Sequence, residues 1–210
     1  MGLVYRATLS PSKRELVEAW LPTRAWAAGL VVADKVAEYR FDDPEGEVGV
    51  ETILWRTDDG ALLQTPLTYR AAPLRGAEDF LVGTSEHSEL GSRWVYDGCG
   101  DPVWAATLAA AILTGGRQAQ MVVELDGQLV DVPARMQVRG SGLPDAPVPE
   151  VVSVDSVDDA SMDDGAVTTV VAGPVVLTLA RVVGSSIDGA ATLTGSVGDD
   201  ETVHTLASVR

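Results

Sequence analysis

The sequence predicts an α+β fold in which antiparallel strands predominate and two helices pack on them. Short stretches that alternate apolar and polar residues recur along the chain, and this pattern is typical of strands with one buried face. Asp59-Gly60 and the Asp-Gly pair at 126–127 lie between such stretches, and this dipeptide favours the tight turn of a β-hairpin. Two other stretches follow capping residues, Ser12 and Asp101, and carry apolar residues at helical spacing.

The N-terminal half is expected to contain one short helix among several strands. Ser12 and Glu15 form a capping box, in which each side chain accepts a hydrogen bond from the other residue's backbone amide. The helix ends at Pro22, and its apolar face consists of Leu16, Val17, Trp20 and Leu21. Residues 71–91 are expected to form an irregular surface connection. Strands are expected at residues 2–9, 36–41, 48–55 and 61–69.

The second half begins with a longer helix. Asp101 caps this helix, and Pro102 occupies its first position, where the missing amide costs no hydrogen bond. Gly115 and Gly116 end it. Its apolar stripe consists of Val103, Trp104, Leu108, Ala111 and Ile112. Strands are then expected at residues 119–125, 128–132, 134–138, 166–172, 175–183 and 201–209.

A stretch rich in proline, glycine and aspartate divides the chain. Residues 140–165 contain three prolines and, from Asp155 to Asp164, five aspartates, and this composition is typical of a linker or mobile loop. Residues 1–139, with the helix at 102–114 and the meander after it, are expected to form one domain. Residues 166–210 are expected to form a second, small and mostly antiparallel β region.

The composition excludes several classes of function. Hydrophobic residues make up 46% of the 210 residues, so a folded core is expected. The net charge of −16 repels phosphate backbones and anionic lipids, so we expect neither a nucleic acid nor a membrane as partner. The N-terminus lacks the pattern of a signal peptide, and the single cysteine fits a reducing compartment. We therefore expect a cytoplasmic protein.

Aromatic and arginine side chains are concentrated in three short stretches and form the candidate ligand or partner face. Tryptophan faces can stack on sugar rings, and arginines can hydrogen-bond hydroxyls or hold anions. The alternative is that the aromatic residues close a half-buried sheet while the arginines pair with aspartates. The candidate residues are Trp20, Arg24, Trp26, Tyr69, Arg70, Arg93, Trp94 and Tyr96.

Asp97, Asp101 and Cys99 are the side chains in this region that could take part in catalysis. The two carboxylates could form an acid–base pair, but Asp101 is explained as a helix cap and Asp97 as an ion partner of Arg93. Cys99 is expected to be accessible, with a pKa lowered by the helix start that follows. No histidine lies near it in the sequence to act as a base, so the nucleophile hypothesis is weak.

Metal and nucleotide motifs are not recognisable in the sequence. His87 is expected to be a solvated loop residue, because one histidine in an acidic loop is not a ligand set. The acidic run 155–164 does not follow the spacing of a calcium loop, and the glycines at 140 and 142 do not open a helix as a phosphate loop does. We therefore predict no catalytic, cofactor-binding or metal-binding residue and no cofactor.

Three sequence blocks indicate a family when they are taken together. The blocks are WLPTRAW at 20–26, PLTYR at 66–70 with PL at 73–74, and RWVYD at 93–97 with DPV at 101–103. As a set they resemble the N-terminal cap of actinobacterial maltokinases and of relatives that consist of a cap alone. The resemblance covers residues 1–115. It implies a curved antiparallel sheet wrapped around a helix, similar to cystatins.

The resemblance also implies a set of functional hypotheses. In the full-length family the cap precedes a kinase that phosphorylates maltose with ATP and magnesium, but the catalytic lobe is expected to be missing here, so no catalytic residue is carried over. Residues 167–172 and 175–183 resemble the start of the kinase's small lobe, with Thr178 in place of its nucleotide-binding lysine.

The first hypothesis is a non-catalytic cap-like binding or regulatory protein associated with maltose, trehalose or glucan metabolism. Its partner would be a kinase, a glucan-metabolism enzyme or a carbohydrate. The alternative is a detached part of a split sugar kinase that is active only with a partner. A third hypothesis is a hydrolase that uses Asp97 or Cys99.

Overall fold

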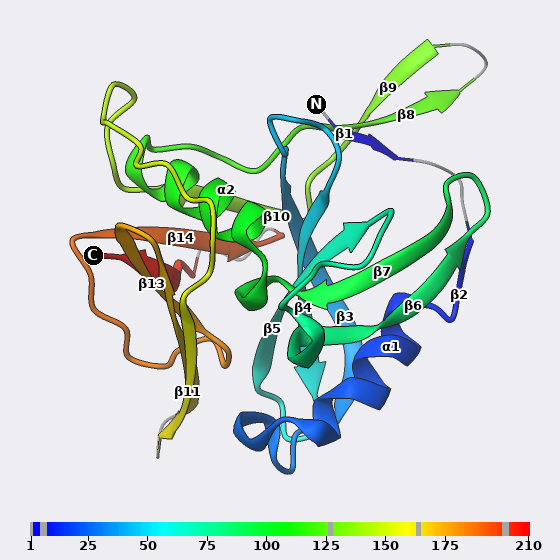
Figure 1. The fold of residues 1–210 in the computed structure, drawn as a ribbon, viewed down its shortest axis with the longest axis horizontal. Helices are drawn as coiled ribbons and strands as arrows, with labels where there is room; N and C mark the ends of the chain where they lie inside the picture. The colour runs from blue at the N-terminus through cyan, green and yellow to red at the C-terminus, as the bar shows by residue number, and fades with distance from the viewer. Residues whose placement is uncertain (1, 5–7, 126–127, 163–164, 199–201) are drawn as a thin grey trace.

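The computed structural model describes residues 2–4, 8–125, 128–162, 165–198 and 202–210. These residues form two six-stranded antiparallel sheets, a small three-stranded sheet and two α-helices (Figure 1). The sequence-based prediction of an α+β fold with two mostly antiparallel regions is therefore confirmed.

The first sheet is curled into a half-barrel (Figure 1). Along β4, Val50 and Leu54 face one core of the molecule, whereas Ile53 and Trp55 face another. Both faces are buried here because one lies against the first helix and the other against the second helix and second sheet. In spatial order the strands are β2 (Leu9–Ser10), β6 (Leu81–His87), β7 (Gly91–Asp97), β5 (Leu62–Arg70), β4 (Gly49–Thr57) and β3 (Val32–Phe41).

Helix α1 (Lys13–Trp20) lies in the curl of the first sheet. The predicted capping box is confirmed: Ser12 Oγ accepts from Glu15 N at 3.3 Å, and Glu15 Oε2 accepts from Ser12 N at 2.7 Å. Two 3₁₀ turns, Leu21–Thr23 and Ala25–Ala27, follow the helix. The helix buries Leu16, Val17 and Trp20 in the same core as Ile53, Leu67 and Val95 of the sheet.

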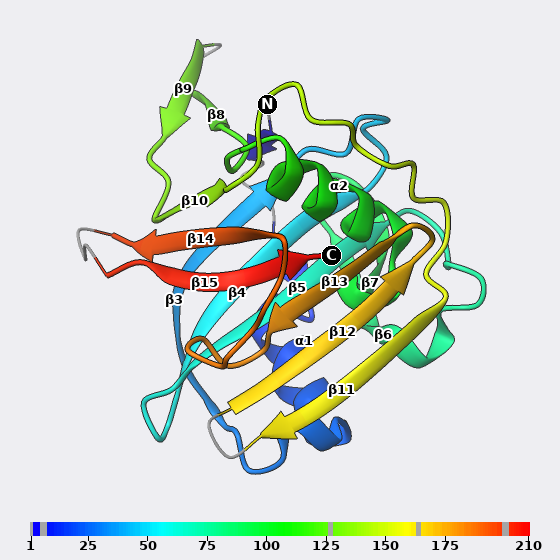
Figure 2. The same ribbon diagram turned by 90° about the vertical axis from the view of Figure 1, so that its left-hand side faces the viewer.

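The second sheet lies beside the first and faces the viewer in Figure 2. Its core side is formed by alternating apolar residues such as Val170 and Ala172, which are fully buried. In spatial order its strands are β10 (Met136–Gly140), β14 (Ala191–Val197), β15 (His204–Val209), β13 (Val175–Ala180), β12 (Gly165–Ala172) and β11 (Ser156–Met162).

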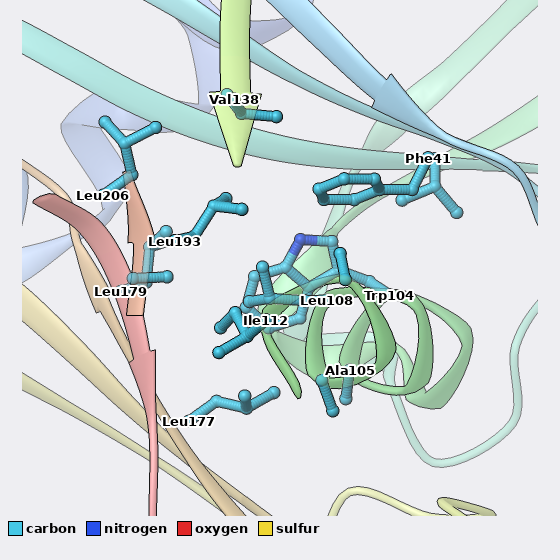
Figure 3. Packing of buried hydrophobic residues seen from close by; sticks show 14 of the residues in the cluster. Phe41, Trp104, Ala105, Leu108, Ile112, Val138, Leu177, Leu179, Leu193 and Leu206 are labelled. Atoms are coloured by element: carbon cyan, nitrogen blue, oxygen red, sulfur yellow. The ribbon is translucent and has the colours of Figure 1, made fainter. Parts of the chain in front are cut away.

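Helix α2 (Pro102–Leu113) packs in the core that both sheets share (Figure 3). Its side chains Trp104, Leu108 and Ile112 are buried, as the apolar spacing predicted. The first sheet contributes Tyr39, Phe41, Val50 and Leu54 to this core, and the second contributes Leu177, Leu179, Leu193 and Leu206.

The two sheets are also joined by direct hydrogen bonds at the start of β5. Gln64 N donates to Arg181 O at 2.7 Å, and Val183 N donates to Leu62 O at 2.8 Å. The buried Gln64 side-chain amide donates to two further carbonyls of the second sheet, at 2.7 and 3.1 Å. Because β7 pairs only with the far end of β5, at Leu67–Arg70, this edge of β5 can accept the second sheet.

The third sheet contains β1 (Gly2–Val4), β8 (Met121–Leu125) and β9 (Gln128–Val132). Strand β1 pairs in parallel with β8, and the β8–β9 hairpin extends away from the two larger sheets (Figures 1 and 2). The turn predicted at 126–127 lies outside the described residues, as do residues 5–7 of the strand predicted at 2–9.

Four strands lie where the sequence did not indicate them. Strand β6 lies within residues 71–91, so the prediction of an irregular connection there is wrong. Strand β11 lies within the predicted linker 140–165, and β7 and β14 lie in segments for which the sequence predicts no strand. Most side chains of β11 are exposed, and those of β6 are mostly exposed or partly buried, so these strands show no apolar alternation and are held by pairing with β12 and β7.

Strand β10 also pairs differently from the prediction. It was expected to continue the meander after 128–132, but it pairs with β14 of the second sheet. The second sheet therefore contains strands from before and within the predicted linker, as well as strands after it. The division at 140–165 itself stays a prediction.

Candidate functional site

The segment between β7 and α2 connects the first sheet to the shared core, and we refer to residues 97–104 as the clasp. The chain bends at a 3₁₀ turn, Gly98–Gly100. Its two glycines let aromatic rings pack directly against the backbone of the turn. A Cβ atom at Gly98 would lie 2.8 Å from the Trp104 ring, and one at Gly100 would overlap the Phe80 ring. Glycine is needed at both positions because any larger residue would displace a buried aromatic ring.

Asp101 has the capping role that the sequence predicted and a second role that it did not reveal. Its Oδ1 accepts from Val103 N at 2.9 Å, which caps α2. The same carboxylate receives two hydrogen bonds from Arg70, both at 2.7 Å, and one from Thr68 Oγ1 at 2.7 Å. Because Asp101 is fully buried with these partners, it stabilises the fold and does not face a substrate.

Asp97 pairs with Arg181, and the predicted pairing with Arg93 is wrong. Arg181 Nη2 lies 2.6 Å from Asp97 Oδ2, and Arg181 Nη1 lies 3.1 Å from Asp97 Oδ1. Arg181 also donates from Nε to Thr168 Oγ1 at 2.7 Å, and its guanidinium lies 4.5 Å from the centroid of the Trp26 ring. Arg93 and Asp97 lie on the same strand, β7, where four residues span about 13 Å, so the two side chains are too far apart to pair.

The Arg181–Asp97 pair is charged and buried. Burial alone lowers the pKa of Arg181, but the Asp97 carboxylate outweighs this effect, so the pKa is raised above the ordinary arginine value. The pair is thus a permanent ion pair that joins the two sheets. A carboxylate held in this way is a structural group and not a general acid or base.

Cys99 is buried, so the prediction of an accessible thiol with a lowered pKa is wrong. Its exposed fraction is 0%, and burial raises its pKa well above the ordinary value. The 3₁₀ turn places the side chain in the shared core before α2 begins. The hydrolase hypothesis loses its support, because Cys99 is protonated and both aspartates are engaged.

The candidate aromatic and arginine residues are divided between different environments. Trp20 and Trp26 are buried in the core around α1, where their rings meet edge-to-face with centroids 5.9 Å apart. Arg24 stacks over Trp20 at 5.6 Å and donates to the Asp79 carbonyl at 3.1 Å. These three residues hold the 3₁₀ turns after α1 against the sheet.

The remaining candidates lie on β5 and β7. Tyr96 is buried and its hydroxyl accepts from Leu74 N at 2.9 Å, and Arg70 is engaged by Asp101. Arg93 and Trp94 are both partly exposed but point to opposite faces of β7. The eight residues therefore do not form one continuous surface. Whether Trp94 or Arg93 contacts a ligand or partner stays a prediction.

A charged cluster around Glu51 was not found from the sequence. The buried Glu51 carboxylate lies 2.6 Å from Lys13 Nζ and accepts from the Tyr69 hydroxyl at 2.8 Å. The Lys13 ammonium also lies 5.3 Å from the centroid of the Tyr69 ring. Burial alone raises the pKa of Glu51, but Lys13 and Arg40 outweigh it and lower the pKa to about 2. The one signal in the sequence is that Glu51 alternates with Ile53 and Trp55 along β4, which places this carboxylate on the strand face that packs against α1.

We expect Glu51 to make the stability depend on pH below 5. Its folded-state pKa of about 2 lies below the ordinary value of 4.5, so its contribution is present above pH 4.5 and is lost as pH falls toward 2. The contribution is up to about 3 kcal/mol. Glu51→Gln should lower the free energy of unfolding at pH 7 by that amount and make its fall between pH 5 and 2 shallower, as measured by urea unfolding at several pH values.

The control for this measurement is Glu45→Gln, which removes an exposed carboxylate from the turn between β3 and β4. This variant should retain the pH dependence of the wild-type protein. Equal slopes for Glu51→Gln and the wild-type chain would contradict the role given to Glu51.

His87 is part of a turn rather than a solvated loop. It ends β6, and its Nδ1 accepts from Glu89 N and Leu90 N, both at 3.2 Å. Within the described residues, no three histidine, cysteine or acidic side chains are grouped so that they could hold a metal ion. No described helix is long and apolar enough to cross a membrane.

Comparison with known proteins connects this geometry to a family. The family model of the maltokinase N-terminal cap domain matches residues 20–101, which extend from the end of α1 through the first sheet to Asp101. The resemblance inferred from the three sequence blocks is therefore confirmed over this range. Among curated proteins, no sequence matches the chain.

Proposed function

From the match of residues 20–101 to the maltokinase N-terminal cap domain, we propose that this chain is a non-catalytic, cap-like binding or regulatory protein. Its partner would be a kinase or another enzyme of maltose, trehalose or glucan metabolism, in the cytoplasm. The family match carries this proposal, because it is the observation that connects the chain to sugar metabolism. The family match is compatible with two modes of action, contact with a protein partner and binding of a carbohydrate.

The structural roles of the clasp support a non-catalytic role. Asp97 is engaged by Arg181, Asp101 by Arg70 and Thr68, and Cys99 is buried in the shared core. The part of the chain with the most concentrated functional groups thus uses them to hold the sheets and α2 together. A binding protein needs only an exposed surface that contacts its partner. Catalysis would require some of these side chains to be free to reach a substrate.

Trp94 is the candidate residue that best fits contact with a protein partner. It is partly exposed on β7, and a tryptophan at the centre of a protein interface often contributes a large share of the binding energy. Strand β6 and the part of β7 that carries Trp94 lie on the side of the first sheet away from the second sheet (Figure 1), which β7 meets at its end through Asp97.

The tagged wild-type chain, incubated with native cell extract, is expected to retain a sugar kinase or a glucan-metabolism enzyme, identified by mass spectrometry. Trp94→Ala should reduce this capture about tenfold or more, the loss typical of an interface tryptophan. Leu143→Ala is the matched control, because Leu143 is 73% exposed at a distant site, and it should retain full capture. Equal capture by both variants would exclude the β7 surface as the contact.

The proposal is overturned if the purified chain alone phosphorylates maltose or glucosamine with ATP. An assay of labelled phosphate transfer, with the chain free of other proteins, gives this result directly.

The alternative is that the chain is one part of a split sugar kinase. The feature that favours it is the shared core, because the second sheet packs against the cap domain as a lobe of a larger protein would. In this case sugar phosphorylation should appear only when the chain is mixed with its captured partner. Activity of the partner that is independent of this chain would argue against the alternative.

A further inference from the structure

A hollow of about 330 Å³ lies between the first turn of α1 and the strands β3 and β4. Lys13, Arg14 and Lys35 line it, together with the buried apolar side chains of Ile53 and Trp55. Small-molecule sites in proteins have volumes of about 300–1,000 Å³ and are mostly apolar with a few convergent polar groups. The volume of the hollow lies at the lower end of this range, and its lining is richer in basic groups than that of a typical site.

The charge of this lining is opposite to that of the chain as a whole. The sequence has 31 acidic and 15 basic residues, and Lys13 and Lys35 are its only two lysines. Both lysines nevertheless line the same hollow, together with Arg14, and the described lining includes no carboxylate. Because the rest of the surface repels anions, this hollow is a place where an anion can bind favourably.

Ion pairs hold the three cations in place without using all their hydrogen-bond donors. A lysine ammonium has three donors and a guanidinium has five. Each of the three pairs is made to a carboxylate that does not line the hollow, so the cations can also face a ligand. The pairs are Lys13–Glu51 at 2.6 Å, Lys35–Glu38 at 3.0 Å and Arg14–Glu18 at 2.6 Å.

We propose that this hollow binds a small phosphorylated carbohydrate. A phosphate monoester carries a charge of about −1.5 to −2 at pH 7 and has three strong acceptor oxygens, which suits a hollow lined by three basic side chains. The phosphate in this proposal rests on the geometry alone, whereas the carbohydrate rests on the proposed function.

Calorimetric titration of the full chain with glucose 1-phosphate, inorganic phosphate and glucose tests this site. We expect saturable binding of glucose 1-phosphate, weaker binding of inorganic phosphate and no binding of glucose. Lys35→Ala and Arg14→Ala should each weaken binding about tenfold or more, as expected when a charged hydrogen bond is lost. Lys13 is left intact because its removal would leave the buried Glu51 carboxylate unpaired.

The matched control is Arg75→Ala, which removes an exposed cation outside the hollow and should bind like the wild-type chain. Equal weakening by all three variants, or binding of glucose as strong as that of glucose 1-phosphate, would overturn the proposal. Absence of any binding would also overturn it. Binding of both phosphates with equal strength would retain the anion site and exclude the carbohydrate. None of these results depends on capture of a partner from the extract, so the site and the proposed function can fail separately.

Discussion

Arg181→Met is expected to lower the free energy of unfolding by about 3–5 kcal/mol, the range seen when one member of a buried ion pair is removed. The methionine would fill much of the arginine's volume but leave the Asp97 carboxylate buried and without its charged partner. The contact of the guanidinium with Trp26 and its hydrogen bond to Thr168 would be lost as well. Urea unfolding at pH 7, followed by tryptophan fluorescence, measures the effect.

Arg93→Ala is the control for this prediction. Arg93 is partly exposed and does not contact Asp97, so its removal should change the stability by about 0.5 kcal/mol or less. The double variant Arg181→Met with Asp97→Leu should recover most of the loss, because no unpaired charge remains. If Arg93→Ala were as destabilising as Arg181→Met, the assignment of Arg181 as the charged partner of Asp97 would be contradicted.

Trp104→Ala is expected to lower the free energy of unfolding by about 3–5 kcal/mol, as is typical when a large buried aromatic side chain is truncated. Trp104 is 1% exposed and packs among Phe41, Leu108 and Ile112 in the shared core (Figure 3). Its ring also lies against Gly98, so the clasp would lose the surface on which its turn packs. Thermal and urea unfolding of the purified variant measure the effect.

Trp94→Ala provides the matched comparison, because it removes the same side chain ten residues earlier in the sequence. Trp94 is partly exposed, and it should cost less than half as much stability as Trp104→Ala. The Trp94→Ala variant should therefore remain folded and suitable for the capture experiment. Equal losses for the two variants would mean that Trp94 belongs to the core.

Local sequence signals predicted the elements that begin or end with a strong cap or turn. The capping box at Ser12 and Glu15, the Asp59-Gly60 turn and the cap at Asp101 all act between residues close in sequence. Such signals are visible in one sequence because the hydrogen bonds they make are local. Strands β6, β11 and β14 were missed because their pairing with distant or neighbouring strands, and not their own side chains, defines them.

The site was predicted less well because its important contacts connect distant residues. Closeness in the sequence favours Arg93 as the partner of Asp97, four residues away, whereas the partner in the structure is 84 residues away. Cys99 was expected to be accessible because it lies between two glycines. Those glycines instead allow the Trp104 and Phe80 rings to close over the turn. Without a known fold, the sequence contains no signal for either contact.

The core that both sheets share extends beyond the residues that match the family model. Residues 20–101 supply Tyr39, Phe41, Val50 and Leu54 to that core, but its other walls come from α2 and the second sheet. A fragment limited to the matched residues would expose these four side chains to water. The segment that is recognisable as a cap is thus smaller than the segment that closes the shared core, and a homologue that kept only the cap would need another apolar surface to cover the same face.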